Sequence, residues 1–429
     1  MNICVLGAGY VGLTTTAVLA ELGHDVICID KDPDKIKQLR QKKIPIYEPG
    51  LCELIENNSQ RITFCTDSYK GILKSDAIFI AVGTPSDQDG KPDLTYVLSV
   101  IEDLSKAIIS YKTVITKSTV PPGTNEMIEL MLMKKGVKRK YFDIVSNPEF
   151  LREGSAVYDM LHGDKTVIGL KKNDSRSLPV MREIYNGIKA PFIVTSLTGA
   201  ELIKYANNAF LATKISFINE MSRICEAYGV DITEISKGIG ADPRIGPQFL
   251  QAGLGYGGSC FPKDLQALYY AAVSKNVTAQ ILQAVQSVNE TQIDFYMKKL
   301  FAVMHDLRGK KITVLGISFK PSTDDTRYSR AIALIEKFMN LDCRLFAYDP
   351  KARLPKHVLE KATQAETLEE SIDQADCLIL ATEWEEFIQL DWQYVKEKMK
   401  GNIIVDGRNC LEPDKMKALG FKYIGVGRG

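Results

Sequence analysis

The N-terminal segment limits the possible folds of this chain more than any other part. Residues 2–6 (NICVL) are predicted to form a buried strand, residues 7–12 (GAGYVG) a turn, and residues 14–23 (TTTAVLAELG) a helix. In this G-x-G-x-x-G arrangement Gly7 allows the tight turn, Gly9 lets the backbone approach a pyrophosphate, and Gly12 lets helix and strand pack closely. The start of the helix then turns its positive end towards the phosphates. The segment predicts a dinucleotide-binding unit.

The second predicted strand supplies the acidic residue that such a unit needs. Residues 25–30 (DVICID) end in Asp30, whose carboxylate is expected to bind the adenosine ribose hydroxyls. Its charge repels a 2′-phosphate, which favours NAD over NADP. Lys31 and Lys35 weaken this inference slightly, although Lys35 could instead line the adenine end of the site.

Three further candidates stand at the ends of predicted strands. Thr84 closes residues 75–85 (SDAIFIAVGTP), Thr119 lies in residues 113–124 (TVITKSTVPPGT), and Glu149 lies in residues 142–154 (FDIVSNPEFLREG). Ligands of open α/β sheets gather beyond the carboxyl ends of strands, so these residues are site candidates. For Thr84 a helix cap is an equally good interpretation.

Length and composition set the wider limits. A chain of 429 residues is expected to form two or three domains. Its net charge of +1 gives no reason to expect nucleic acid or a membrane as partner. Nine scattered cysteines without a metal-ligand pattern favour a reducing compartment and no metal site. No signal peptide or membrane-spanning run is apparent, so we expect a cytoplasmic protein.

The middle of the chain is predicted to be helical. From Thr195 the alternation of strands and helices stops, and one long helix is expected to reach Val230. Lys204 and Asn208 lie one turn apart on a stripe of this helix. They are expected to point into a cleft and donate to a developing oxyanion, and the alternative is an ordinary solvated helix face.

An irregular segment, residues 241–264, follows and contains GLGYGGSCFPKD. Its glycines allow close approach of a ligand to the main chain. Cys260, with Lys263 and Asp264 nearby, has the surroundings of an activated nucleophile, whereas the alternative is an inert packed thiol. The apolar faces of the central helices need a partner, so we expect a homodimer through this region.

The last third repeats the plan of the first. Residues 310–320 (KKITVLGISFK) correspond to the first strand and its turn, and GNIIVDGRN stands where TVITKSTVPP stood. The turn that begins at Gly316 lacks the second and third glycines of the G-x-G-x-x-G motif, so a second dinucleotide site is not supported. Lys320, Arg327 and Arg408 lie at or beyond strand ends and together suit a nucleotide diphosphate.

The predicted fold class is therefore α/β, with two Rossmann-like, doubly wound domains joined by a central helical dimerisation domain. The expected boundaries are 1–195 for the NAD-binding domain, 196–300 for the helical domain with the Cys260 loop, and 301–429 for a C-terminal Rossmann-like domain that suits a nucleotide diphosphate.

Seven ordered motifs carry a resemblance to a known family: GAGYVG, VGTP, KSTVPPGT, NPEFLREG, ELIKYANNAFLATKISFINE, GYGGSCFPKD and GISFKPSTDDTR. The chain resembles the UDP-glucose/GDP-mannose dehydrogenase superfamily along nearly its whole length. The resemblance implies a four-electron oxidation of the C6 alcohol of a nucleotide sugar to a carboxylate, with two NAD⁺ used in succession. UDP-glucose, giving UDP-glucuronate, is the expected substrate.

The resemblance also implies roles for individual residues. Cys260 is similar to the nucleophile that forms a thiohemiacetal and then a thioester. Lys204 and Asn208 resemble the pair that stabilises the oxygen at C6. Asp264 and Thr119 resemble the groups that hold a water, and Glu149 the base of thioester hydrolysis.

Two sets of binding residues follow from the resemblance. For the cofactor it implies, beside the glycine turn, Val11, Asp30, Lys35, Thr84, Thr119, Glu153, Lys263 and Arg327. For the nucleotide sugar it implies Glu149, Phe150, Leu151, Arg152, Glu153, Lys204, Asn208, Phe249, Leu250, Gln251, Ala252, Gly253, Gly257, Lys320 and Arg408, with Arg244 reaching across the dimer interface. Phe249 begins a loop that varies within the superfamily, so GDP-mannose or a UDP-N-acetylhexosamine is the alternative substrate. A simple two-electron dehydrogenase and an inactive NAD-binding regulator are more distant alternatives.

Overall fold

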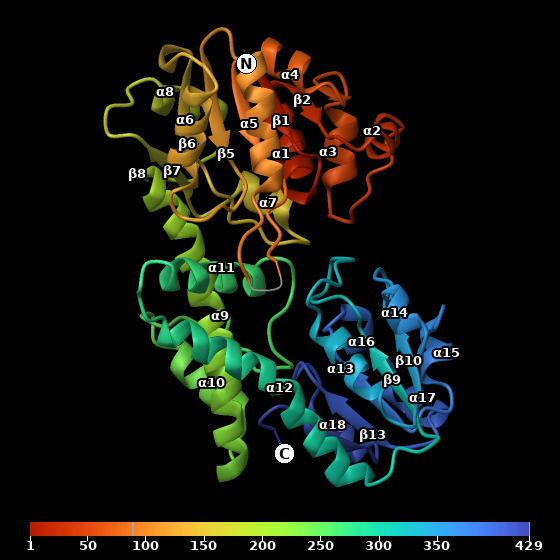
Figure 1. Cartoon of the computed structure of the whole chain (residues 1–429). Coiled ribbons are helices and arrows are strands. Elements are labelled where there is room, and N and C mark those ends of the chain that lie inside the picture. The colour runs from red at the N-terminus through yellow and green to blue at the C-terminus, as the bar shows by residue number, and fades with distance from the viewer. Residues whose placement is uncertain (88–89, 429) are drawn as a thin grey trace. The chain divides into compact units, whose positions relative to one another are not determined.

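The computed structural model describes residues 1–87 and 90–428 (Figure 1). The chain divides into two compact units, one of Met1–Asn207 with Gln266–Asn276 and one of Asn208–Leu265 with Val277–Gly429. The division passes through two helices, α9 (Leu197–Tyr228) and α11 (Phe261–Val273), so each of them contributes residues to both units. The division into three domains remains a prediction.

An eight-stranded sheet in the order β3-β2-β1-β4-β5-β6-β7-β8 organises the first unit. Neighbouring strands from β3 to β6 are parallel, β7 meets β6 antiparallel, and β8 is parallel to β7. The strands are β1 (Asn2–Leu6), β2 (Asp25–Ile29), β3 (Ile62–Cys65), β4 (Ala77–Ile80), β5 (Lys112–Thr116), β6 (Phe142–Ser146), β7 (Thr166–Leu170) and β8 (Phe192–Ser196). The strand order reverses between β1 and β4, which is where ligands of such sheets bind.

Helices cover both faces of this sheet because its strands are apolar on both sides. Ile3 and Val5 of β1 belong to one buried cluster and Cys4 and Leu6 to another, as the period of two requires. The first cluster includes residues of α1 (Tyr10–Glu21), α2 (Pro33–Arg40), α3 (Leu51–Asn57), α7 (Ala156–Leu161) and α8 (Ser177–Ile184). The second includes residues of α4 (Ser68–Lys74), α5 (Thr95–Ala107) and α6 (Thr124–Lys134), and a 3₁₀ turn spans Arg139–Tyr141.

A six-stranded parallel sheet in the order β11-β10-β9-β12-β13-β14 organises the second unit. Its strands are β9 (Lys311–Leu315), β10 (Arg344–Tyr348), β11 (Ala362–Gln364), β12 (Cys377–Leu380), β13 (Ile403–Asp406) and β14 (Lys422–Ile424). The first five occupy the same order as β1 to β5 of the first sheet. The predicted correspondence of the two units is therefore confirmed.

One face of the second sheet is covered by the helices of its own fold and by the central helices. The shared core contains residues of α9, α10 (Ile232–Gly240), α12 (Gln280–Met304), α13 (Arg330–Phe338) and α14 (Lys356–Leu359). The other face packs against α15 (Leu368–Ile372), α16 (Glu385–Ile388), α17 (Trp392–Lys398) and α18 (Pro413–Ala418). The second half of α9 thus has a buried side within its own unit.

The structure confirms the predicted fold class: two Rossmann-like sheets with a helical segment between them in the sequence. One boundary differs from expectation, because the irregular segment ends at Cys260 and residues 261–264 form the first turn of α11. Pro262 is tolerated there since a first-turn N–H has no partner within the helix. No helix in the described part of the chain is long and apolar enough to cross a membrane.

Candidate active site

The glycine turn after β1 fits a dinucleotide. A Cβ on Gly7, at φ +106°, would lie 2.6 Å from the Ala81 carbonyl oxygen, and one on Gly12 would lie 1.8 Å from that of Gly7. A Cβ on Gly9 would meet nothing within 4 Å. Gly7 and Gly12 are thus required for packing, whereas Gly9 leaves open space at the start of α1, where no side chain caps the helix. Uncapped N–H groups beside open space suit a pyrophosphate.

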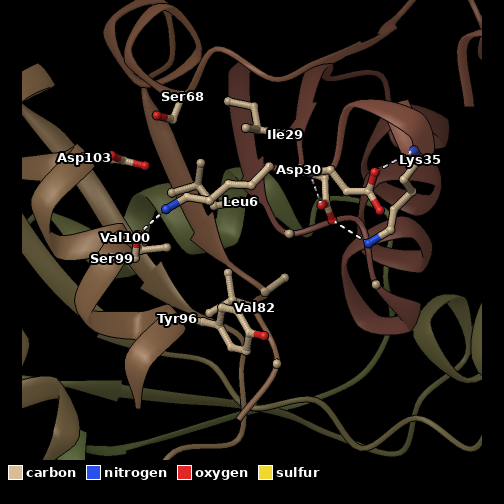
Figure 2. Close-up of a pocket in the computed structure, with 16 residues that line it drawn as sticks. Leu6, Ile29, Asp30, Lys35, Ser68, Val82, Tyr96, Ser99, Val100 and Asp103 are labelled. Atoms are coloured by element: carbon tan, nitrogen blue, oxygen red, sulfur yellow. Dashed lines mark hydrogen bonds and ion pairs between the residues drawn. The ribbon is translucent and has the colours of Figure 1, made fainter. Parts of the chain in front are cut away.

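A pocket of about 400 Å³ continues from this turn along the ends of the strands. It is lined by residues that include Gly7, Gly9, Asp30, Lys31, Asp32, Lys35, Val82, Gly83, Tyr96, Ser99 and Asp103 (Figure 2). Sequence reasoning missed the part contributed by α5, since Tyr96 and Ser99 lie within a helix and not at the end of a strand. The side chain of Lys31 donates to the Ser99 hydroxyl, which ties β2's end to α5.

Asp30 is held as an anion in this pocket. Its Oδ2 accepts from the Ala8 N–H at 2.9 Å. The same oxygen accepts from Lys35 Nζ, also at 2.9 Å (Figure 2). Burial alone would raise the pKa of Asp30, but the hydrogen bonds from Asp32 N–H, Lys35 and Ala8 N–H lower it overall. An ionised acceptor at this place suits the ribose hydroxyls. Lys35 lines the pocket as the ion-pair partner of Asp30.

Thr84 and Thr119, which follow β4 and β5, lie in contact. The Thr84 hydroxyl donates to the Thr119 carbonyl oxygen at 2.7 Å. Thr84 is not at a helix N-cap, so the capping alternative is wrong. Val11 lies in the first turn of α1. Its side chain packs against the buried cluster that includes Ala8.

Glu149 and Lys204 form a buried ion pair in the first unit. Glu149 follows β6, Lys204 lies in α9, and Nζ is 3.0 Å from Oε1. The other carboxylate oxygen of Glu149 accepts from the Leu151 N–H. The Lys204 ammonium also lies 5.3 Å from the centre of the Phe150 ring. Because the stripe residues Glu201, Lys204 and Asn208 are all buried, the solvated-face alternative is wrong.

The remaining residues of the NPEFLREG motif point elsewhere. The guanidinium of the exposed Arg152 pairs with Asp159 at 2.5 Å. Glu153 is half-buried and precedes Gly154, whose N–H donates to the Tyr10 hydroxyl at 2.8 Å and to Glu48 at 2.6 Å. This segment is thereby fastened to the glycine turn and α1.

In the second unit, Asn208 and Lys263 both bind Asp264. Asn208 Nδ2 and Lys263 Nζ each donate to this carboxylate at 2.6 Å, and Asp264 is fully buried. Cys260 directly precedes α11, is half-buried, and has its Sγ 3.7 Å from the Ser259 hydroxyl. A helix start favours negative charge on a neighbouring group, as a thiolate nucleophile requires.

The glycines before Cys260 allow the loop to approach the chain's own atoms. A Cβ on Gly257 would lie 2.3 Å from the Tyr328 carbonyl oxygen, and one on Gly258 would lie 2.7 Å from the Phe319 ring. Asn289 of α12 accepts from the Tyr256 N–H and donates to its carbonyl. The protein's own residues Tyr328 and Phe319 therefore make the close approach that these glycines permit. Sequence reasoning missed Asn289, which lies in a helix of ordinary appearance.

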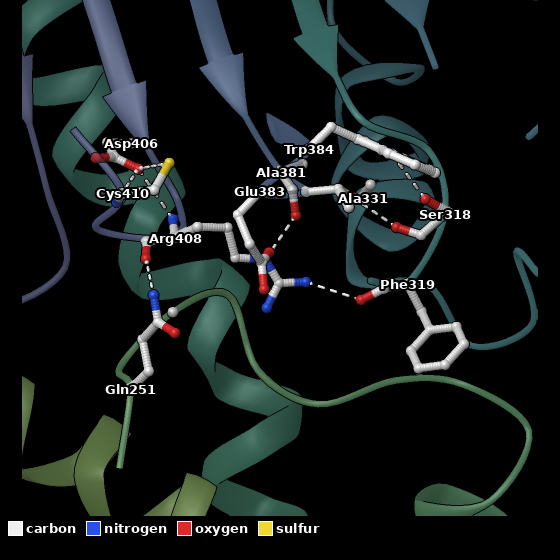
Figure 3. Close-up of polar contacts among 12 residues, drawn as sticks. Gln251, Ser318, Phe319, Ala331, Ala381, Glu383, Trp384, Asp406, Arg408 and Cys410 are labelled. Carbon is white, nitrogen blue, oxygen red and sulfur yellow. Dashed lines mark hydrogen bonds and ion pairs between the residues drawn. The ribbon is translucent and has the colours of Figure 1, made fainter. Parts of the chain in front are cut away.

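In the second sheet the strand order reverses between β9 and β12. Arg408 follows β13, and its guanidinium reaches the segments that follow these two strands. Its guanidinium donates to the carbonyls of Ala381 (2.8 Å) and Phe319 (3.0 Å) and pairs with Glu383 at 3.1 Å (Figure 3). Phe319 directly precedes Lys320 in the sequence, so the Arg408 guanidinium contacts the residue next to this second predicted cation. The guanidinium of Arg327 instead pairs with Asp325 at 2.7 Å.

The loop Phe249–Gly253 contacts Arg408 in the second unit. Phe249 has φ +63°, a strained value for a residue with a side chain, at a cost of about 1–3 kcal/mol. Gln251 Nε2 donates to the Arg408 carbonyl at 2.9 Å (Figure 3). Leu250 and Ala252 are buried in the core, and the Gly253 N–H donates to Asn219. Arg244, predicted to act across an interface, has an 87% exposed side chain paired with Asp242.

No group of three or more His, Cys, Asp or Glu side chains in residues 1–87 and 90–428 is arranged to hold a metal ion.

Comparisons with known proteins agree along the whole chain. Profiles of the UDP-glucose/GDP-mannose dehydrogenase family match at residues 1–189 (NAD binding domain), 198–291 (central domain) and 313–413 (UDP binding domain). YtcA of Bacillus subtilis (strain 168) is 56% identical over 428 residues, with 100% of both chains covered. The UDP-glucose 6-dehydrogenase YwqF of the same organism is 44% identical, with 100% of this chain and 98% of the relative covered.

Solved structures give the same result. A UDP-glucose dehydrogenase from Pyrobaculum islandicum is 37% identical with a TM-score of 0.90, covering 100% of this chain and 98% of that one. A UDP-D-ManNAc dehydrogenase from Pyrococcus horikoshii is 28% identical with a TM-score of 0.89, covering 100% of both. The glycine turn, the carboxylate that follows β2 and these matches lead to one conclusion: the chain belongs to the UDP-glucose/GDP-mannose dehydrogenase family and carries that family's NAD-binding domain at residues 1–189.

Proposed function

We propose that the protein oxidises the C6 alcohol of UDP-glucose to the carboxylate of UDP-glucuronate, reducing two NAD⁺ per sugar. The relatives named UDP-glucose 6-dehydrogenase, matched over the full chain, support the substrate. The observation that carries the chemistry is the half-buried thiol of Cys260 at the start of α11, with Asn208 and Lys263 bound to Asp264 one turn further on. Acyl chemistry at a thiol accounts for an oxidation that continues past the aldehyde.

When bound, NAD⁺ would supply the acceptor for the hydride that leaves C6 in each of the two oxidations. In the first, Lys204 and Asn208 donate to the C6 oxygen as it loses its proton. Cys260 Sγ then adds to the aldehyde carbon to give a thiohemiacetal. After the second hydride leaves C6 this becomes a thioester, which water hydrolyses to the carboxylate while the thiol is released. Asp264 and Thr119 hold a water for proton transfer, and Glu149 acts as the base that activates the hydrolytic water.

Binding is assigned to the two crevices. Asp30 holds the adenosine ribose, Gly9 and α1 the pyrophosphate, and the residues Val11, Lys35, Thr84, Thr119, Glu153, Lys263 and Arg327 complete the cofactor site. The nucleotide sugar is bound by Arg408 and Lys320 at its diphosphate end and by the segments 149–153 and 249–253 with Gly257, Lys204 and Asn208 at the sugar.

We also propose that two copies assemble through α9. Phe210, Phe217, Ile224 and Tyr228 recur at spacings of seven, seven and four on this helix and are 66%, 47%, 46% and 81% exposed. An apolar stripe of this kind is expected to be covered by a second helix. The dimer would bring Arg244 of one copy to the substrate of the other. Light scattering that gives the mass of a monomer would reject this part of the proposal.

The test of the reaction is its stoichiometry. UDP-glucose supplied in limiting amount should yield two NADH per sugar, and GDP-mannose and a UDP-N-acetylhexosamine should yield little. Turnover only with another nucleotide sugar would move the assignment to that sugar, as the similarity to a UDP-D-ManNAc dehydrogenase would then suggest. One NADH per sugar with a free aldehyde would replace the four-electron mechanism by a two-electron one, and no turnover with any sugar would favour a regulator.

Substitution of the nucleophile tests the covalent step. Cys260→Ser should lower net turnover by about 1,000-fold or more, because the hydroxyl of serine is a much weaker nucleophile than a thiolate. Binding of NAD and UDP-glucose should be retained. Cys343→Ser, at another half-buried thiol of the second unit, is the control and should keep full activity.

A further inference from the structure

A side chain of α12 holds the loop before Cys260, although the reaction described above does not use it. Asn289 lies in the first half of α12 and is buried. Its Oδ1 accepts from the Tyr256 N–H at 2.8 Å, and its Nδ2 donates to the Tyr256 carbonyl at 3.1 Å. One side-chain amide thus pairs with both main-chain groups of a loop residue, as a neighbouring strand would. Because Tyr256 stands four residues before Cys260, the amide fixes the backbone just ahead of the thiol.

The contact between Asn289 and the loop is close on both sides. Gly255 has φ +113°, and a Cβ on it would lie 2.5 Å from Asn289 Oδ1, so the approach of the amide requires glycine here. Arg330, the first residue of α13, donates through Nε to the Leu254 carbonyl at 3.2 Å. It also donates through Nη2 to the main-chain carbonyl of Asn289 at 2.9 Å. The same guanidinium therefore binds the loop and the helix that holds it.

An aromatic contact carries this constraint to the residue after the thiol. The buried Tyr256 ring meets the Phe261 ring edge-on, with centroids 6.1 Å apart and planes at 78°. Rings in this arrangement attract each other. The Phe249 ring lies 6.2 Å from the same Phe261 ring. Phe261 begins α11 directly after Cys260, so the position of Tyr256 acts on the nucleophile from both sides of the thiol.

The loop needs such a constraint because Gly257 and Gly258 stand between Tyr256 and the thiol. Glycine has no strong backbone preference of its own, so the contacts on either side of the two glycines determine where the thiol lies. Bond formation requires Sγ at about 3–3.5 Å from the reacting carbon, and a misplacement of about 1 Å can cost about 100-fold in rate.

Resting on the proposed function, we propose that Asn289 is a positioning residue for Cys260: by binding both main-chain groups of Tyr256 it places Sγ for its addition to the aldehyde. Asn289 acts through the loop and not on the reacting atoms. The first hydride transfer precedes the addition and does not depend on Asn289, whereas the second oxidation does. A loss confined to the second oxidation therefore separates positioning of the thiol from a general effect on folding.

Single-turnover oxidation of UDP-glucose, with enzyme and NAD⁺ in excess, resolves the two oxidations as two phases of NADH formation. Asn289→Asp keeps the size of the side chain and the acceptor for the Tyr256 N–H, but it places a second acceptor against the Tyr256 carbonyl. The first phase should stay within about threefold of the wild-type rate. The second phase should slow by about 10–100-fold, and hydroxylamine should trap the aldehyde that accumulates.

Asn409 offers a matched control in the same unit. Its Nδ2 donates to the Val426 carbonyl and its Oδ1 accepts from the Val426 N–H, both at 2.8 Å, so it holds the C-terminal segment as Asn289 holds the loop. Asn409 has φ +52°, which aspartate also tolerates. Asn409→Asp should lower the thermal midpoint as Asn289→Asp does, yet keep the wild-type ratio of the two phases.

A second pair of variants decides the matter where Asn289→Asp does not fold. Tyr256→Leu removes the ring that packs on Phe261 but keeps both main-chain bonds to Asn289, and should slow the second phase alone by about 10-fold. Tyr256→Phe keeps the ring and should keep the wild-type rates of both phases.

Four results would overturn the proposal: a wild-type second phase in Asn289→Asp, an equal slowing of both phases in that variant, a selective loss of the second phase in Asn409→Asp, or the same rates in Tyr256→Leu and Tyr256→Phe. A wild-type enzyme that forms only one NADH per sugar, or none, refutes the proposed function instead, and is recognised before any variant is made.

Discussion

The two sheets have the same backbone arrangement at the turn that follows their first strand. The Gly7 N–H donates to the Ile29 carbonyl at 2.7 Å, and the Gly316 N–H donates to the Tyr348 carbonyl at 2.8 Å. Each glycine has a positive φ, and each directly follows the first strand of its sheet. Each second strand is followed by an aspartate, Asp30 in one unit and Asp349 in the other.

The aspartates differ in what they bind. Asp30 accepts from one residue of the turn, Ala8, and lines a pocket of about 400 Å³. Asp349 Oδ2 accepts from the N–H groups of Ile317 and Ser318, from the Ser318 hydroxyl at 3.0 Å, and from Trp384 Nε1 at 3.2 Å. Ser318 stands where the first turn has Gly9.

The difference explains why one plan gives two kinds of site. In the first unit a missing side chain at Gly9 leaves space beside an anion that has acceptor capacity left. In the second unit Ser318 stands at the place of Gly9, and it and Trp384 donate to the Asp349 carboxylate. The polar group left for a ligand in this unit is instead Arg408. This agrees with the expectation that a second dinucleotide site is not supported.

The largest effect is expected on stability in the second unit. Asp349→Ala leaves several buried donors without an acceptor, so the free energy of unfolding should fall by about 4 kcal/mol, each such donor costing about 1–3 kcal/mol. Urea unfolding measures it. Asp30→Ala, at a carboxylate that is 15% exposed, should cost about 1 kcal/mol. Equal losses would show that the two aspartates have the same structural role and would break the comparison.

Filling the open space in the first unit should remove cofactor binding. Gly9 has φ −84°, which any residue can adopt, and its Cβ would meet no protein atom within 4 Å. Gly9→Leu should therefore fold normally and bind NAD at least about 100-fold more weakly, equivalent to about 3 kcal/mol. Calorimetric titration with NAD gives the affinity, and an unchanged thermal midpoint is the control. Wild-type affinity in this variant would contradict the assignment of the turn.

A smaller effect is expected from the charge of Asp30. Asp30→Asn keeps an acceptor but loses the anion, so NAD should bind about 10-fold more weakly, since hydrogen bonds to charged groups contribute about 1.5–3 kcal/mol. Discrimination against NADP should fall as well, because the repulsion of a 2′-phosphate is removed. Affinities for both cofactors measure this, and a variant that still rejects NADP as the wild type does would locate the discrimination elsewhere.

The smallest effect concerns the ion pair of Asp30 with Lys35, whose side chain is 30% exposed. Lys35→Met should lower the free energy of unfolding at pH 7 by about 0.5 kcal/mol, as for partly exposed pairs in general. Because the pKa of Asp30 is lowered in the folded protein, its stabilising effect is complete above about pH 4 and is lost as pH falls through the lowered value. The difference between variant and wild type should therefore decrease as pH falls below about 4, and a constant difference would assign it to packing of the lysine stem.

Much of the fold could be predicted from local signals. Continuous apolar runs that end at or near a glycine predicted β1, β4 and β9, and helical spacing over more than 30 residues predicted α9. The start of α11 was missed, because Cys260 and Pro262 are typical of loops as well as of first turns. The antiparallel junction of β6 and β7 carries no local mark, since a strand's direction depends on where the connecting segment runs.

Candidate site residues could be proposed from the sequence, but their contacts could be predicted only in part. Lys204 and Asn208 were expected to act as one pair, yet the structure gives them different carboxylates, Glu149 and Asp264. Glu149 lies 55 residues from Lys204 in the sequence, and Asp264 lies 56 from Asn208.

The sequence by itself determined the two sheets, the glycine turn and the acidic residue after each second strand, because these depend on the backbone angles and apolar period of short segments. Only the tertiary structure decided which of the two aspartates stays available to a ligand. That outcome depends on Trp384, which lies 35 residues beyond Asp349 and reaches it through the packing of the second sheet. A hydrogen-bond partner brought from so far along the chain leaves no trace in the local pattern, although it determines whether a carboxylate faces a nucleotide or the protein's own interior.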